Sequence, residues 1–397
     1  MLAIVNARVL TVTGGTLEHG DILMDQGKIV AVGEGLAIPE GTRVIDGRGK
    51  WVTPGLIDAH THIAIKEEPN TMPALGEVLE NFDPITPAAR ALDNLNPRDH
   101  AIAAVRSAGF TTCCTLPGSG NLIGGTSVVF KTAEARTAEE LVIPGKEQMK
   151  MAMGENPRRI HGTKGHSPRT RMGNAMVLRE ALYNARVYSD ALLAAEKDPS
   201  RRPAPNFRMD ALVPVVRGEM RCRIHCHRAD DMVTAGRIAE EFHLKYSIEH
   251  ATEGWKIADY LRERQITCVL GPHAIGPDKT ETWGRRLDNP AILEKSGVNF
   301  CLTEDNRSAT RFLPVYIGMM IARGLSFDTA LKAVTLHPAR LLEIDDHVGS
   351  IEPGKDADLA IFNGNPFSSL TLCEKTLVDG VVYDRREDVF GDTGVTD

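Results

Sequence analysis

The sequence lacks several features that would place it among membrane or nucleic-acid-binding proteins. No apolar stretch approaches the roughly 18 residues of a membrane-spanning helix. The first residues lack the basic segment, apolar run and cleavage site of a secretory signal, so we read them as a strand of the mature protein. Basic residues are not in excess, because the formal net charge is −7. We therefore expect a globular protein that contacts neither membranes nor nucleic acids.

Cysteine spacing also excludes one class of metal site. The seven cysteines are an odd number, and most of them lie inside apolar runs. Cys222 and Cys226 are close to histidines, but no second cysteine pair has zinc-finger spacing. We therefore interpret the cysteines as reduced core residues of a cytoplasmic protein.

The length of 397 residues fits one α/β barrel, which needs about 250, with a small accessory domain. Eight strand-like runs lie at 56–60, 111–116, 127–131, 148–153, 221–225, 246–250, 267–270 and 299–303. Between most of them lie helical patterns, such as those at 99–108, 170–195, 229–242 and 254–264. This alternation predicts a parallel TIM (β/α)8 barrel over residues 54–346. Short strand-like runs at both ends predict one discontinuous β-sandwich, formed by residues 1–53 and 347–397. We expect the polar insertion at 65–98 to be a mobile element over the barrel mouth.

Two histidines end the first barrel strand. His60 and His62 are two residues apart, so in an extended strand both project to the same face. At the carboxyl end of a barrel strand that face points into the interior, where two imidazoles can chelate a divalent metal. A lone histidine would favour an incidental core residue, but this pair favours a metal site.

Three later strands end in similar side chains. One run ends at His225 and is followed by His227, another ends at His250, and a third is followed by Glu304 and Asp305. Catalytic groups in barrels come from such strand ends, so these side chains should meet at one rim. Each one could be an incidental core residue, but the set together indicates a functional centre.

These motifs resemble those of the amidohydrolase superfamily, which includes dihydroorotase, isoaspartyl dipeptidase and imidazolonepropionase. Residues 54–62 are similar to the first-strand motif of that family, and 337–340 and 349–359 are similar to its return into the β-sandwich. The resemblance aligns His225, His250 and Asp305 with the metal ligands of the fifth, sixth and eighth strands. It spans nearly the whole chain and implies a superfamily, not a substrate.

The fourth strand offers two candidate ligands. Lys150 stands where many members of the resembled family carry a lysine carboxylated by CO2 that bridges two metals. An ammonium beside metal cations is electrostatically unfavourable, whereas a carbamate reverses the charge. Glu155 is the alternative ligand, and a mononuclear site with Lys150 merely paired to an acid is also open. We favour Lys150.

The resemblance implies a metal-dependent hydrolase of carbon–nitrogen bonds in amides, peptide-like compounds or cyclic amides. A bound metal makes water more acidic, and Asp305 would act as the general base. Zinc is the default ion for nitrogen and oxygen ligands, as one or two ions. Two alternatives remain: a deaminase of a heterocycle on the same centre, and a non-catalytic scaffold with the same fold. We expect a small-molecule substrate, and assembly into a homo-oligomer is left open.

A basic segment after the fourth strand suggests the charge of the substrate. Residues 156–171 contain five arginines or lysines and no acid, in a chain that is acidic overall. A guanidinium can bind a carboxylate through two hydrogen bonds, so Arg169 or Arg171 would hold an anionic substrate. A solvated basic loop is the alternative reading. His227 and His273 are further candidates for substrate contact.

Overall fold

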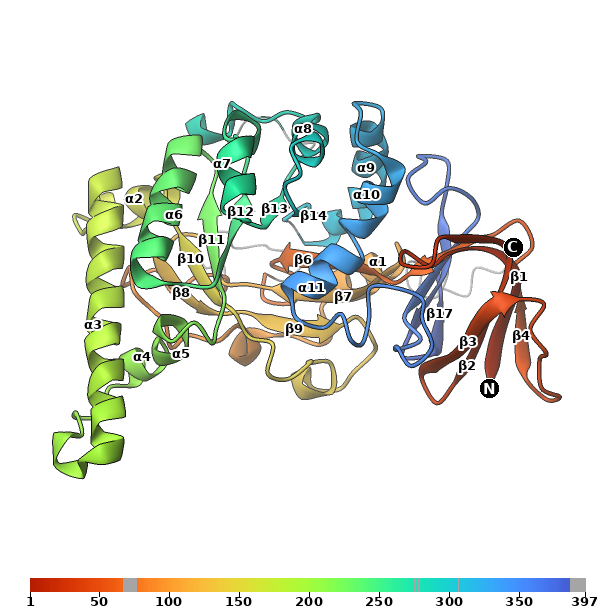
Figure 1. The fold of residues 1–397 in the computed structure, drawn as a ribbon, viewed down its shortest axis with the longest axis horizontal. Coiled ribbons are helices and arrows are strands. Elements are labelled where there is room, and N and C mark those ends of the chain that lie inside the picture. The colour runs from red at the N-terminus through yellow and green to blue at the C-terminus, as the bar shows by residue number, and fades with distance from the viewer. Residues whose placement is uncertain (67–76, 274–275, 277–278, 306, 386–397) are drawn as a thin grey trace.

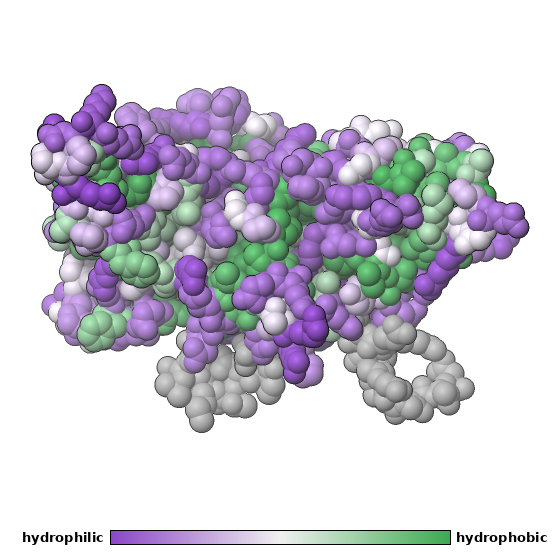
Figure 2. Space-filling view, turned by 90° about the horizontal axis from the view of Figure 1, so that it is seen from below, coloured by the Kyte–Doolittle hydropathy of each residue, from purple (hydrophilic) through white to green (hydrophobic). Residues whose placement is uncertain are grey.

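The computed structural model describes all residues except 67–76, 274–275, 277–278, 306 and 386–397. Its strands form two regions that lie side by side, a larger α/β body and a smaller β region (Figure 1). Viewed from below, the surface is mainly hydrophilic, with hydrophobic residues gathered in separate patches (Figure 2). Within the described part, no helix is long and apolar enough to cross a membrane.

Both ends of the chain contribute to the β region. Its eight strands form one sheet in the order β17-β16-β15-β5-β1-β2-β3, with β4 paired to β1. The antiparallel pair β5–β15 joins the two ends, and apolar side chains such as Ile4 and Leu359 form a separate core. The strands are β1 (Leu2–Leu10), β2 (Thr16–Asp25), β3 (Lys28–Glu34), β4 (Arg43–Asp46), β5 (Trp51–Pro54), β15 (Leu359–Phe362), β16 (Cys373–Val378) and β17 (Val381–Asp384).

The α/β body is TIM-barrel-like, and its strands are almost completely buried. β6 and β7 are parallel neighbours, and β10 to β14 form a second parallel series in sequence order. The two series approach each other where the Thr303 hydroxyl donates to the His60 carbonyl oxygen, 2.7 Å away. The strands are β6 (Leu56–Thr61), β7 (Phe110–Thr115), β10 (Met149–Ala152), β11 (Cys222–Cys226), β12 (Tyr246–His250), β13 (Cys268–Leu270) and β14 (Phe300–Leu302).

A strand forms where one was expected at 127–131, but the prediction that it runs parallel to its neighbours is wrong. β9 (Val128–Lys131) runs antiparallel to β7, and β8 (Ile123–Thr126) runs antiparallel to β10. A parallel partner needs a crossover of a dozen or more residues, usually with a helix. The stretch between Thr115 and Val128 contains β8 instead of a helix, so the chain reverses without crossing over.

Helices lie outside the strands of the α/β body (Figure 1). The longest helix among the described residues, α3, matches the helix expected at 170–195 to within two residues at each end. The helix α6 has the bounds expected from its pattern, 229–242. The helices are α1 (His100–Arg106), α2 (Glu155–Gly162), α3 (Arg171–Lys197), α4 (Phe207–Asp210), α5 (Val213–Val216), α6 (Ala229–Phe242), α7 (Ala258–Glu263), α8 (Asn289–Lys295), α9 (Leu313–Ile321), α10 (Phe327–Lys332) and α11 (Leu336–Leu341).

The insertion at 65–98 falls only partly within the described residues, because 67–76 lie outside them. Its second half contains one turn of 3-10 helix at Ala91–Asn94. Bridges from Ile85 to Ile123 and from Arg90 to Thr126 align it with β8. This half is therefore held against the strands, while the predicted mobility of the insertion stays a prediction.

Candidate metal centre

The first strand presents its two histidines as its spacing predicts. His60 lies in β6 and is completely buried, while His62 follows the strand and is partly buried. The His62 Nδ1 lies 2.7 Å from the Leu116 carbonyl oxygen and donates to it in the matching tautomer. In that tautomer the Nε2 atom of His62 carries the free lone pair that a metal ligand needs.

The buried carboxylate of Glu249 orients the ring of His60. The Nδ1 of His60 lies 2.6 Å from Oε2 of Glu249, a residue of β12. The Arg223 guanidinium donates to both oxygens of the same carboxylate, at 2.7 and 2.8 Å, and all three side chains are withdrawn from solvent. Burial alone would raise the pKa of Glu249, but Arg223 and the hydrogen bond with His60 lower it well below its usual range. Glu249 therefore stays ionised and orients His60.

Asp305 lies beside both histidines of β6. Its Oδ1 is 3.4 Å from Nε2 of His60 and 3.5 Å from Nε2 of His62, and the three residues form a group with metal-ligand spacing. This Oδ1 is buried and has no hydrogen-bond partner among the described residues. An unpaired buried oxygen facing two imidazoles is the arrangement expected of a metal ligand.

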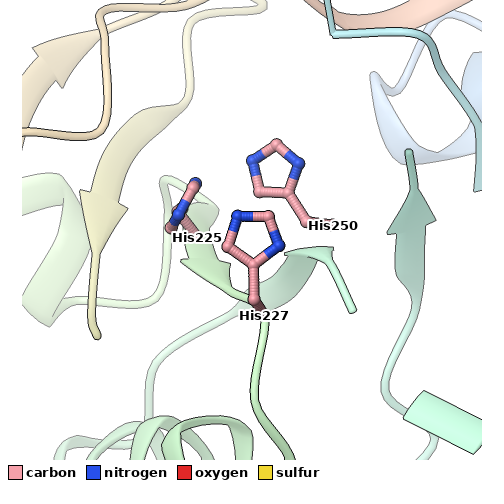
Figure 3. A group of neighbouring side chains, drawn as sticks. All are labelled: His225, His227 and His250. Carbon is pink, nitrogen blue, oxygen red and sulfur yellow. The ribbon is translucent and has the colours of Figure 1, made fainter. Parts of the chain in front are cut away.

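Three further histidines form a second group with ligand spacing, shown in Figure 3. His225 is the penultimate residue of β11, His250 ends β12, and their ring centroids are 4.3 Å apart. His227 stacks on His250 at 4.8 Å. The Nδ1 atoms of His250 and His227 contact the Gly271 carbonyl and the Thr252 hydroxyl, both at 2.7 Å. By contrast, Nδ1 of His225 is buried and unpartnered among the described residues.

Lys150 stands next to this pair of groups. It is a completely buried residue of β10, and its Nζ lies 3.0 Å from Nε2 of His60. The His60 and His250 rings are 4.9 Å apart, so the two groups adjoin. Lys150 is therefore placed at the centre, whereas the alternative Glu155 belongs to neither group. Glu155 begins α2, and its side chain lines a pocket with Arg158 and Arg159.

Burial controls the protonation of the centre. It lowers the pKa of His60 to about 3, with a further contribution from the Lys150 ammonium. The other four histidines of the two groups are likewise shifted well below their usual pKa by burial. Burial also lowers the pKa of Lys150 to about 8 and raises that of Asp305 to about 7. The imidazoles are therefore neutral, which is the form that coordinates metals.

The residues fit a divalent metal ion. Neutral imidazole nitrogens and a carboxylate are the donors that zinc accepts. One buried acceptor atom, Oδ1 of Asp305, has no hydrogen-bond partner among the described residues and lies 3.4 and 3.5 Å from Nε2 of His60 and His62. Hydrogen bonds to Nδ1 of His60, His62 and His250 also orient their rings, as outer partners of metal ligands do.

Comparison with known proteins identifies the family. A crystal structure of an amidohydrolase from Thermotoga maritima MSB8 is 36% identical and superimposes with a TM-score of 0.93, covering 97% of this chain and 100% of that one. The family model "Amidohydrolase family" matches residues 244–393. The chain belongs to the amidohydrolase family. This confirms the resemblance of its strand-end motifs.

Longer relatives in the family share most of this chain. "Amidohydrolase tasK" of Hapsidospora irregularis is 27% identical over 391 residues, which are 91% of this chain and 39% of that protein. An "Adenine deaminase" of Clostridium botulinum (strain Loch Maree / Type A3) is 22% identical over 390 residues, which are 96% of this chain and 56% of that protein. The chain thus spans two fifths to just over half the length of these amidohydrolase relatives.

The two arginines of the predicted clamp lie in different surroundings. The Arg171 guanidinium contacts Asp231 at 3.0 Å and Glu281 at 3.6 Å, so its charge is already balanced by two acids. Arg169 is exposed and lines the pocket next to Glu155. His273 is buried, its Nε2 contacts the Leu270 carbonyl at 2.8 Å, and it belongs to neither histidine group.

Sequence reasoning missed two sets of supporting residues. Arg223 and Glu249 lie in the middle of apolar runs on neighbouring strands, and this pairing of opposite charges was the available signal. Lys279 donates to Oδ1 of Asn156 at 3.2 Å, and Nδ2 of Asn156 lies 3.4 Å from Nε2 of His225. No sequence pattern marked Lys279, because its contact with Asn156 joins segments that are 123 residues apart.

Proposed function

We propose that the chain is a metal-dependent hydrolase of carbon–nitrogen bonds in amides, peptide-like compounds or cyclic amides. The observation that carries the proposal is the junction of the two histidine groups beside Lys150, at the carboxyl ends of the barrel strands. The proposed metal ligands are His60, His62, Lys150, His225, His250 and Asp305.

Asp305 is the proposed general base and general acid of the reaction. A bound divalent ion supplies Lewis-acid activation of water and of the scissile carbonyl. Asp305 takes a proton from the attacking water at a carboxylate oxygen and later delivers it to the leaving nitrogen. The carbon–nitrogen bond breaks, the carbonyl carbon keeps the water oxygen, and the amine leaves neutral. Burial raises the pKa of Asp305 to about 7, which suits a group that both accepts and returns a proton.

We propose zinc as the ion and a carbamate on Lys150 as the bridge between two ions. Because burial lowers the pKa of Lys150 to about 8, its neutral amine is accessible for reaction with CO2. Carbamate formation joins the amine nitrogen to the carbon of CO2 and releases one proton. The product is anionic and offers two oxygens, which suits a position between cations.

The proposed substrate carries an anionic group, such as the carboxylate of an N-acyl amino acid or a small peptide. Lys279 supports this, because it reaches Asn156 beside His225. Its Nζ also pairs with Glu281 at 3.3 Å, so an anionic substrate would share Lys279 with that carboxylate. Arg169 would add charge farther out, in the pocket it shares with Arg158 and Arg159. Arg171, whose charge is balanced by two acids, would instead position Asp231 and Glu281. His227 would contact the substrate next to His225.

Three broader features also remain proposals. The strand series would close into a (β/α)8 barrel at the approach of β14 to β6. The domain limits would be 1–53 with 347–397 for the β-sandwich and 54–346 for the barrel. The cysteines are free and buried, which supports a reducing, cytoplasmic location.

A deaminase is the second candidate, favoured by the similarity to the adenine deaminase of Clostridium botulinum. In that reaction the same centre would add water to a ring carbon and release ammonia. The two reactions are separated by their products. We expect zinc-loaded protein to release amino acids from N-acyl amino acids or small peptides, and to release no ammonia from adenine. Ammonia from a heterocycle as the sole product would favour the deaminase, and inactivity on every compound would favour the scaffold.

A further inference from the structure

Five arginines line one pocket on the face of the molecule that carries the metal centre. The pocket has a volume of about 430 Å³, and its lining comes from the segments that follow β10, β11 and β13. These segments leave the carboxyl ends of parallel strands, where the proposed metal ligands also lie. The pocket is therefore open to a molecule that approaches the centre.

Two of the five arginines already have acidic partners. Arg171 contacts Asp231 at 3.0 Å and Glu281 at 3.6 Å. Arg228 contacts Asp230 at 2.8 Å. The charge of these two arginines is balanced within the protein, so they shape the pocket without making it positive.

The other three arginines have no acidic partner. Among the described residues, Arg158, Arg159 and Arg169 form no ion pair and no side-chain hydrogen bond, and Nε of Arg158 is buried without a partner. One acid that also lacks an ion pair, Glu155, lines the same pocket. Three cations against one anion leave two positive charges in excess, although the formal net charge of the chain is −7.

Helix periodicity and local packing bring these arginines together. Glu155, Arg158 and Arg159 stand at positions i, i+3 and i+4 of α2, so they share one face of the helix. Gly162 continues that face, and a Cβ atom there would lie 3.6 Å from Cγ of Arg169. The chain after α2 therefore folds back and sets Arg169 beside the two helical arginines.

A phosphate group matches this pocket better than a carboxylate does. A phosphate monoester carries a charge of about −1.5 to −2 at pH 7, which balances the excess, whereas a carboxylate would leave positive charge uncompensated. Its three terminal oxygens can also accept paired hydrogen bonds from more than one guanidinium. A carboxylate has only two oxygens, which one guanidinium already satisfies.

The wall of the pocket is linked to the metal centre. Glu281 lines the pocket and contacts Nζ of Lys279 at 3.3 Å. Lys279 donates to Oδ1 of Asn156 at 3.2 Å, and Nδ2 of Asn156 lies 3.4 Å from Nε2 of His225. Three side chains therefore connect the pocket wall to the second histidine group.

We propose that Arg158, Arg159 and Arg169 form a phosphate-binding site, which we call the arginine pocket. The phosphate belongs either to the substrate, as a monoester, or to a separate molecule, and both sources share the same chemistry. The substrate source deepens the proposed function and rests on it, whereas binding of phosphate itself does not.

Equilibrium dialysis with labelled inorganic phosphate tests the site on the full-length protein. It is carried out on metal-free and zinc-loaded protein, because phosphate also coordinates zinc. We expect binding without metal, and Arg159→Met/Arg169→Met should weaken it by about 100-fold. Each substitution removes hydrogen bonds to a charged group, which is worth about tenfold or more. Both side chains are exposed, so circular dichroism and metal content should stay the same.

Arg202→Met is the matched control for the dialysis. Arg202 is also exposed and lies beyond the far end of α3, a helix of 27 residues that spans about 40 Å. This variant should bind phosphate as the parent does. No binding by the parent, binding only in the presence of zinc, or equal binding by the double variant would overturn the phosphate site.

Hydrolysis by the zinc-loaded protein distinguishes the two sources. A phosphate of the substrate predicts that kcat/KM for N-acetyl-O-phosphoserine exceeds that for N-acetylserine by about tenfold or more, that inorganic phosphate competes, and that Arg159→Met/Arg169→Met loses the preference. A separate phosphate predicts no preference, but a change in N-acetylserine hydrolysis when inorganic phosphate is added. Inactivity on both compounds would count against the proposed hydrolase, while the dialysis would still decide the phosphate site.

Discussion

Lys150 places its Nζ 3.0 Å from Nε2 of His60, in an interior from which both side chains are excluded from solvent. An ammonium in that position would repel any cation held by His60. The same amine as a carbamate would attract it. Under the proposed function, the charge state of Lys150 would therefore control metal binding by the centre.

Removal of the lysine amine should empty the centre. We expect Lys150→Ala to lose more than about 100-fold in metal affinity, beyond the losses typical of outer contacts. A short carboxylate such as propionate should restore part of the metal content, because it can occupy the space of the side chain and supply two oxygens. Metal quantification with and without propionate checks this. Undiminished metal in Lys150→Ala would show that the lysine is not a ligand.

Reconstitution should depend on pH and on bicarbonate. Since the pKa of Lys150 is lowered to about 8, about three quarters of the amine is neutral at pH 8.5 and only about 3% at pH 6.5. Only the neutral amine reacts with CO2, so recovery of activity from metal-free protein should be faster at the higher pH. Added bicarbonate should accelerate it further. Recovery that ignores bicarbonate at both pH values would argue for an unmodified lysine.

Glu249 should act on the metal through His60. We expect Glu249→Gln to weaken metal binding by about 10- to 100-fold, because the His60 ring loses its carboxylate partner. It should also destabilise the fold by about 3–5 kcal/mol, because Arg223 is left buried without its counter-charge. Chelator competition and thermal unfolding measure the two effects.

A double variant separates these effects. Arg223→Met/Glu249→Gln removes the stranded charge and should recover much of the stability without recovering metal affinity. Ser247→Ala, which deletes only a hydroxyl donor to Glu249, is the matched control and should change metal affinity little. If metal affinity returned together with stability in the double variant, the role of Glu249 would be purely structural.

Lys279 should select substrates by charge. For an N-acyl amino acid, Lys279→Met is expected to raise KM about tenfold or more, since a hydrogen bond to a charged group is worth about 1.5–3 kcal/mol. For the corresponding neutral amide KM should change little, and metal content should stay the same. Lys256→Met is the control, because Lys256 is paired on the surface with Glu253. Equal changes in KM for anionic and neutral substrates would show that Lys279 does not recognise the charge of the substrate.

The positions of the side chains at the strand ends could be predicted from the sequence. His60 and His62 share a face because strand side chains alternate, and the same reasoning placed His225, His250 and Asp305 at one rim. The bounds of α6 also followed from its helical pattern. Their roles as ligands stay predictions.

The missing parts depend on contacts between distant segments. An alternating pattern does not encode strand direction, so 127–131 was expected to run parallel and β9 runs antiparallel to β7. The ion pairs of Arg171 with Asp231 and Glu281 could not be predicted, because both acids lie far away in the sequence. Lys279 contacts Asn156, which is 123 residues away in the sequence, and no motif marks this pair.

Metal titration of stripped protein tests the central claim most directly. Chelator-treated protein should be inactive and should regain hydrolysis in proportion to added zinc, saturating at one or two ions per chain. Under the same conditions His60→Ala should bind less metal and recover no comparable activity. Full hydrolytic activity in rigorously metal-free protein, or in His60→Ala without metal, would contradict the account.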